Sequence, residues 1–213
     1  MGKIMEAIFC VAYLICTSIL GICILKKAKG DKESKLFGIM TLVLVSGDSF
    51  HLVPRIMAAI DKAGDYSKAM GIGTLITSVT MTIFYVILYF LYEMRSNKKN
   101  KPLMISMMVL AVVRIILCLM PQNDWTGESP VSWGVYRNIP FVIMGIIMIA
   151  LYFQRRDDKP YRFMWLAITL SFAFYLPVVL WADVSPMIGM LMLPKTCMYV
   201  WMVVMGYRDT GSK

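Results

Sequence analysis

The sequence predicts an all-α integral membrane protein: a bundle of seven transmembrane helices with its N-terminus outside and its C-terminus in the cytosol. Composition, the length of the apolar runs and the distribution of positive charge predict this fold. The chain has 213 residues, of which 59% are hydrophobic and 16% charged, and a mean hydropathy of +0.67. One soluble core of this length cannot bury so much apolar surface, so lipid is expected to cover the excess.

Seven apolar runs, bounded by charges, prolines or glycines, divide the chain. Runs of about 20 residues cross the roughly 30 Å hydrocarbon layer as helices. They lack the period-2 alternation of strands, and only helices or closed barrels satisfy backbone polar groups in lipid. We therefore predict a single transmembrane domain over residues 1–213, with spans at about 4–25, 36–60, 69–92, 103–121, 135–153, 161–182 and 187–206.

The first run, at about 4–25, is too long for the core of a signal peptide and has neither a basic leader nor an A-x-A site, so we expect a retained span. The second, fourth and sixth runs each carry a proline near or past their middle: Pro54, Pro121 and Pro177. The third, fifth and seventh runs end near an aromatic residue that has a basic residue within the next three positions. This alternation predicts a lone helix followed by three helical hairpins.

The distribution of lysine and arginine predicts the orientation. Outside the runs, the side with the N-terminus holds only Lys3, Lys62 and Lys68. Short loops rich in basic residues stay in the cytosol, which places the C-terminus there in a multi-pass protein of the cell membrane. The basic residues on that side are Lys26, Lys27, Lys29, Lys32, Lys35, Arg95, Lys98, Lys99, Lys101, Arg155, Arg156, Lys159, Arg162, Arg208 and Lys213.

The formal charge of +9 does not indicate nucleic-acid binding, because the basic residues form short clusters between apolar runs and not one exposed face. The five cysteines lie in apolar runs without a C-x-x-C pair, which favours a packing role. A single histidine cannot build a His-rich metal site. We expect no nucleic-acid partner, no metal and no cofactor.

Ionisable side chains inside spans are costly and usually face the interior of the bundle. By the direction of each helix, all of them here lie between the membrane centre and the outer edge. We therefore predict a polar cavity that opens away from the cytosol, with Ser78 and Tyr175 as further ligand-binding candidates. The polar candidates within or at the ends of the spans are Asp48, His51, Arg55, Arg114, Arg137, Asn138, Asp183 and Lys195.

Asp48, His51 and Arg55 stand at positions i, i+3 and i+7, which is one stripe of a helix. This stripe is either a network that locks helices together or part of a ligand or catalytic site. Asp183 would add a second carboxylate, and paired carboxylates with separated pKa values support acid/base hydrolysis. Cations outnumber carboxylates among the candidates, which favours an anionic or phosphate-bearing ligand.

Lys195 follows Pro194 in the seventh run, and a lysine there also fits the retinal attachment site of a microbial rhodopsin. Against this alternative, the aromatic cage and the counter-ion expected in the third run are missing. That run offers hydroxyls instead, which either contact a ligand or bond their own backbone as helix–helix contacts. They belong to Thr74, Thr77, Ser78, Thr80 and Thr82.

Residues 47–55, GDSFHLVPR, resemble the G-D-x-x-x-L-x-P-R stretch of the YhhN-type membrane proteins, the family that includes the lysoplasmalogenases. The likeness continues at Gly73, Ser78 and Tyr85. It implies a multi-span hydrolase of the vinyl-ether bond of lysoplasmalogens, with Asp48 as the best-matching catalytic position.

Asp183 lies near the position where the family carries a late acidic or amide residue. The chain departs from the family in two features: Val79 stands where the family has a histidine, and the family usually has eight spans where this sequence predicts seven.

Three functions remain open from the sequence. The first is a lysoplasmalogenase-like hydrolase that accepts a lysophospholipid from the outer leaflet, with Asp48, Asp183 and His51 as catalytic candidates. The second is a transporter or seven-span sensor that binds a small anionic molecule without changing it. The third is a scaffold whose polar residues serve packing only. In all three the lipid bilayer is the surrounding partner.

Overall fold

The computed structural model confirms the seven-helix prediction. It describes residues 2–61, 63–97, 99–127, 129–182 and 184–212. Seven helical segments in this part of the chain are long and apolar enough to cross a membrane, so the protein is a multi-pass membrane protein. The helices are α1 (Gly2–Lys27), α2 (Lys32–Ile60), α3 (Ser67–Ser96), α4 (Lys101–Leu119), α5 (Val131–Gln154), α6 (Met164–Trp181) and α7 (Met192–Ser212).

Helix boundaries follow local capping chemistry. The Asp31 carboxylate accepts a hydrogen bond from Ser34 N at 3.0 Å and begins α2, and Asn100 does the same for α4 through Leu103 N at 3.2 Å. The predicted fourth span runs two residues too far, because Pro121 instead opens the short 3₁₀ helix Pro121–Asn123. The seventh crossing begins as the 3₁₀ helix Pro186–Leu191 before α7.

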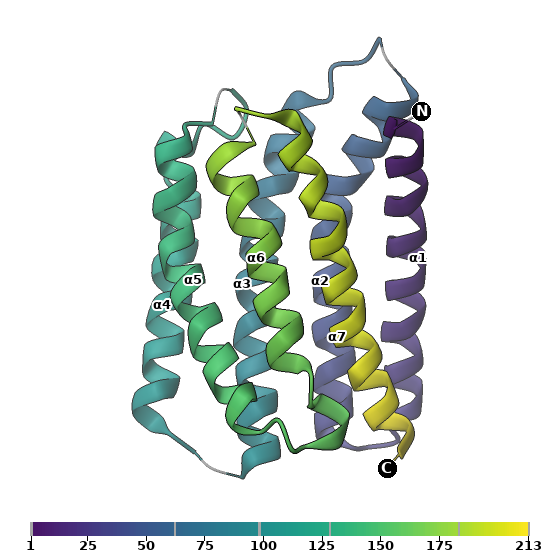
Figure 1. The fold of residues 1–213 in the computed structure, drawn as a ribbon, viewed down its shortest axis with the longest axis vertical. Coiled ribbons are helices and arrows are strands. Elements are labelled where there is room, and N and C mark those ends of the chain that lie inside the picture. The colour runs from purple at the N-terminus through teal and green to yellow at the C-terminus, as the bar shows by residue number, and fades with distance from the viewer. Residues whose placement is uncertain (1, 62, 98, 128, 183, 213) are drawn as a thin grey trace.

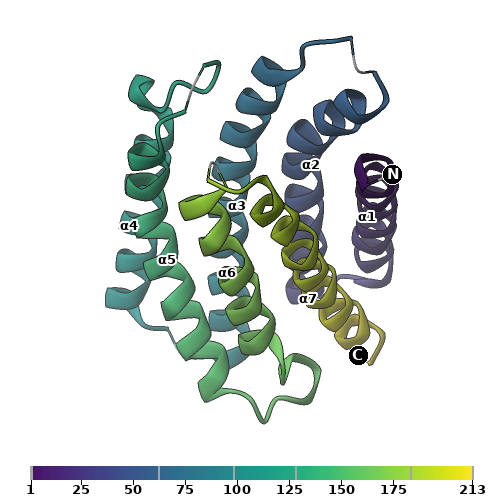
Figure 2. The same ribbon diagram turned by 45° about the horizontal axis from the view of Figure 1, so that its top comes forward.

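The helices form a closed ring in which each packs on its neighbour in sequence and α7 returns to α1 (Figures 1 and 2). Helix α3 also contacts α5 across the ring. The two termini lie at opposite ends of the bundle, as an odd number of crossings requires (Figure 1). We call the end with the basic connections the cytosolic end, as their charge predicts, and the opposite end the outer end.

Helices α2 and α3 pack closely because glycines remove side chains between them. A Cβ on Gly73 would collide with the backbone of Phe50, and one on Gly47 would collide with the Thr80 side chain. Pro54 has no N–H to offer the Phe50 carbonyl, so this carbonyl faces Gly73 without its usual helical partner. The close contact fixes the rotation of α2 and thus the direction in which its polar residues point.

At the cytosolic end, Arg95 of α3 joins three other parts of the chain. Its Nη1 lies 2.8 Å from carboxylate oxygens of Glu33 on α2 and Asp209 on α7. Its Nη2 donates to Asp158 in the α5–α6 connection at 2.9 Å, and its guanidinium lies 4.6 Å from the Tyr161 ring. This arginine cluster therefore joins α2, α3, α7 and the α5–α6 connection at the cytosolic end.

Candidate functional site

Asp48 and Lys195 lie within electrostatic reach of each other in the interior of the bundle. The Tyr13 hydroxyl of α1 donates a 2.6 Å hydrogen bond to Asp48 Oδ2 on α2. Lys195 of α7 is 9% exposed, and its Nζ lies 4.2 Å from the centre of the Tyr175 ring on α6. The lysine also interacts electrostatically with Asp48 and with Arg114. Five helices therefore contribute to one charged cluster.

Arg114 of α4 is the most deeply buried charge in this cluster, at 2% exposure. Its guanidinium carbon lies 3.3 Å from the centre of the Phe141 ring, a close cation–π contact. Within the described part of the chain, Arg114 Nε and Nη1 are buried and find no hydrogen-bond acceptor. A buried charged donor without an acceptor costs free energy, because it has lost its hydrogen bonds to water.

Asn138 and Tyr175 support the cluster from α5 and α6. The Tyr175 hydroxyl donates to Asn138 Oδ1 at 2.8 Å, and Asn138 Nδ2 donates to the Gly134 carbonyl at 2.8 Å. These bonds fix the ring on which the Lys195 ammonium rests. Asn138 and Tyr175 therefore hold the lysine in position, with the ring as its π partner.

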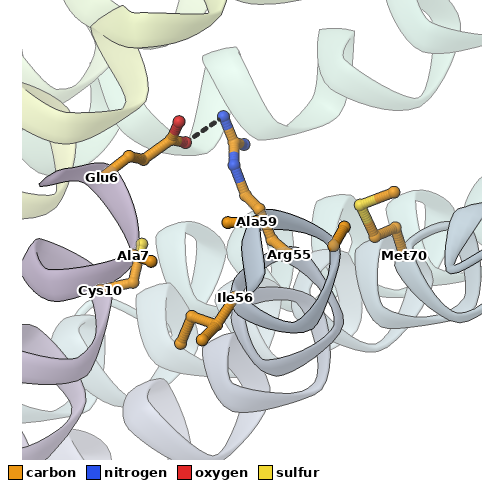
Figure 3. A pocket seen from close by; sticks show the side chains of 8 residues that line it. Glu6, Ala7, Cys10, Arg55, Ile56, Ala59 and Met70 are labelled. Carbon is orange, nitrogen blue, oxygen red and sulfur yellow. Dashed lines mark ion pairs between the residues drawn. The ribbon is translucent and has the colours of Figure 1, made fainter. Parts of the chain in front are cut away.

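A pocket of about 220 Å³ lies at the outer end between α1 and α2 (Figure 3). Glu6 of α1 and Arg55 of α2 form an ion pair of 2.5 Å across it, and Cys10 lines the α1 side (Figure 3). A smaller cavity of about 20 Å³ shares these three residues and is also lined by Tyr13, the donor to Asp48. Tyr13 therefore lines a cavity next to the outer pocket and also contacts Asp48 of the interior cluster.

The other predicted site residues have partners elsewhere. His51 Nδ1 lies 3.0 Å from Thr74 Oγ1 on α3, and Arg137 donates to Asn123 Oδ1 at 2.8 Å. Ser78 donates to the Thr74 carbonyl of its own helix at 2.8 Å. The hydrogen bonds of these three residues therefore lead to other side chains and carbonyls, although His51 also interacts electrostatically with Lys195, and Arg137 with Tyr175. Asp183, the predicted second carboxylate, lies outside the described residues.

The hydroxyls of α3 serve the helices themselves. Thr74, Ser78, Thr80 and Thr82 each donate to a carbonyl three or four residues earlier. Thr77 donates to the Gly47 carbonyl of α2 at 3.0 Å. Of the two alternatives left open by the sequence, these contacts match helix–helix packing.

Sequence reasoning missed Glu6 and Tyr13, although a signal was present. They are seven residues apart on α1, as Asp48 and Arg55 are on α2. Two antiparallel helices with equally spaced polar residues pair them crosswise, so Glu6 meets Arg55 and Tyr13 meets Asp48. Glu6 is moreover the one acidic residue in the first apolar run.

Asp61, at the start of the outer α2–α3 connection, is a carboxylate that bonds to its own loop. Hydrogen bonds from Ala63 N and the Tyr66 hydroxyl, each 3.0 Å long, keep the pKa of Asp61 below its usual value. Asp61 is therefore ionised at neutral pH and organises its own loop. It has no place in the interior cluster.

Among residues that the structure describes, no three His, Cys, Asp or Glu side chains gather to hold a metal ion. Comparison of the chain with protein-family models, with curated protein sequences and with solved structures finds no match. The resemblance of residues 47–55 to the YhhN-type proteins accordingly stays a prediction.

Proposed function

We propose that the protein binds an anionic, phosphate-bearing ligand at the interior cluster of Arg114, Lys195 and Asp48. The observation that carries this proposal is the pair of buried Arg114 donors without an acceptor. A guanidinium presents its N–H groups as a fork that matches two oxygens of one phosphate or carboxylate. Two cations against one carboxylate leave the cluster with an excess positive charge for an anion to neutralise.

The proposed route to the cluster starts at the outer pocket. Arg55 and Glu6 stand at its mouth with side chains 32% and 24% exposed, so water and headgroups reach them. The adjoining small cavity at Tyr13 is too narrow for a phosphate, so passage requires the Tyr13 side chain to move. A ligand from the outer leaflet then meets Asp48, Lys195 and Arg114 in turn.

A binding experiment with two matched arginine variants tests this function. Purified protein in nanodiscs is titrated with radiolabelled lysophosphatidic acid and, separately, with inorganic phosphate. Arg114→Met should weaken saturable binding about 30-fold, because a charge-assisted pair of hydrogen bonds is lost.

The control is Arg137→Met, which removes the same charge from a guanidinium already bonded to Asn123. It should change binding less than threefold. Equal loss in both variants, or no saturable binding of either probe, would overturn the proposal. Binding of phosphate alone would identify the ligand as a soluble anion.

The second candidate function is hydrolysis of ether-linked lysophospholipids, as the YhhN-type resemblance implies. The observation that favours it is the position of Asp48, the matching carboxylate, held by Tyr13 and interacting with Lys195. In this reaction Asp48 as acid protonates the vinyl carbon, and water adds to the resulting oxocarbenium ion. The hemiacetal then breaks into an aldehyde and a glycerophospho compound, and the proton returns to the carboxylate.

Incubation with lysoplasmalogen separates the two candidates. Hydrolysis predicts aldehyde release that Asp48→Asn abolishes, whereas binding alone predicts recovery of the intact lipid. Release that does not exceed the Asp48→Asn background would remove the hydrolase from consideration.

A further inference from the structure

Another cavity, of about 610 Å³, lies at the cytosolic end between α2, α3 and α4, and shares no residue with the interior cluster. Its apolar walls come from all three helices: Leu36 of α2, Phe90 and Met94 of α3, and Met104 of α4. We call it the cytosolic groove. Lys99 and Lys101, both exposed, also line it.

Polarity changes in order along the cytosolic groove. Lys99 lies in the α3–α4 connection and Lys101 is the first residue of α4. Met104 follows three residues on, about 4.5 Å deeper, and Phe90 lies six residues before the end of α3, about 9 Å deep. Cations therefore stand at headgroup depth and apolar side chains at acyl-chain depth.

The carboxylate in this region is engaged by the protein. Glu93 Oε1 accepts hydrogen bonds from the Tyr89 hydroxyl at 2.9 Å and from Asn100 N at 3.3 Å. These bonds tie the end of α3 to the start of α4. Two exposed ammonium groups thus face the headgroup layer beside one carboxylate that is already hydrogen-bonded.

We propose that the cytosolic groove binds one anionic phospholipid of the inner leaflet. Its phosphate lies between Lys99 and Lys101, and an acyl chain packs against Phe90 and Met104. Charge complementarity at the rim and the apolar wall below it select a lipid over a soluble anion, because a soluble anion gains nothing from the wall. Basic pockets between helices at the cytosolic face recognise anionic headgroups in this way.

Native mass spectrometry of the full chain, offered phosphatidylglycerol and phosphatidylcholine at equal concentration, tests this site. Wild-type protein should retain one phosphatidylglycerol with about tenfold preference, since each basic residue near the surface strengthens the attraction. Lys99→Gln/Lys101→Gln should abolish the preference. Met104→Trp should fill the groove and reduce retention of both lipids.

The matched control is Lys29→Gln/Lys159→Gln, which removes two charges from the same end of the protein outside the groove. It should retain the wild-type preference. Equal retention of the two lipids by wild type would overturn the proposal, as would a preference that survives Lys99→Gln/Lys101→Gln. A control that loses the preference equally would show a general charge effect and also overturn it.

Discussion

Arg114 carries a charge where the surrounding helices offer it only partial compensation. The Phe141 ring at 3.3 Å provides a cation–π contact, worth about 2 kcal/mol when desolvated. Removing an ion from water costs several kcal/mol, and Nε and Nη1 find no acceptor within the described residues. The folded protein therefore bears an energetic cost at this residue that a bound anion would relieve.

Replacement of this residue should separate stability from binding. Arg114→Met keeps most of the volume and removes the buried charge, so we expect unfolding in detergent to become harder by about 1–3 kcal/mol. Stabilisation by added lysophosphatidic acid should disappear in the same variant. Measurement of chemical unfolding with and without the lipid checks both effects; a variant that unfolds more easily than wild type would assign Arg114 a structural role.

Tyr13 should contribute through its single hydrogen bond to Asp48. A bond to a charged acceptor is worth about 1.5–3 kcal/mol, and Asp48 is partly buried, so Tyr13→Phe should destabilise by about 1–2 kcal/mol. Tyr136→Phe, on a side chain 53% exposed, provides the control and should change stability by less than about 0.5 kcal/mol. Equal effects of the two substitutions in equilibrium unfolding would contradict the assigned contact.

At the scale of the helices, the α2–α3 contact sets the direction in which Asp48 points. Gly73→Ala places a methyl group against the backbone of Phe50, which cannot rotate away as a side chain would. We expect a loss of about 1–3 kcal/mol in unfolding free energy, because overpacking forces the helices apart.

The control for this contact is Gly189→Ala. A Cβ there meets nothing within 4 Å, so the substitution should be close to neutral. If Gly73→Ala proves equally neutral, α2 and α3 do not approach as closely as described.

Replacement of Arg95 in the cytosolic arginine cluster should lower stability, whereas replacement of Arg114 should raise it. Arg95 is paired with three carboxylates, and Arg95→Met leaves Glu33, Asp158 and Asp209 without this cation. We expect a loss of about 2–4 kcal/mol in unfolding free energy. This is slightly less than the cost of breaking a fully buried ion pair, because the Arg95 side chain is 19% exposed. Arg156→Met, which removes an exposed arginine, is the comparison in thermal unfolding; a neutral Arg95→Met would show that the cluster contributes little.

At the scale of the whole molecule, the sequence predicted the number of crossings because lipid demands long apolar helices. It misplaced helix ends where prolines act locally, as at Pro121. The hydropathy of one apolar run does not show how its helix is rotated about its own axis, or which of its residues lie at the same height as residues of the next helix. Arg55 therefore meets Glu6, and His51 meets Thr74, in contacts that the stripe on α2 alone did not predict.

The candidate site was predictable in part for the same reason. Burial of charge in lipid is costly, and the positions of Asp48, Arg114 and Lys195 within apolar runs therefore predicted that they face the interior, where Lys195 interacts electrostatically with the other two. Asn138 and Tyr175 are also there, but their bond to each other gives them a supporting position. The uncharged partners of these residues, such as Tyr13, do not stand out in an apolar run and are identified only from the three-dimensional packing.

An experimental density map of the protein purified from membranes shows whether the interior cluster holds an anion. We expect non-protein density of an anionic group within hydrogen-bond distance of Arg114 Nε and Nη1, with Lys195 beside it. A guanidinium that contacts only Phe141 and other protein atoms, in a site closed to any ligand, would contradict it.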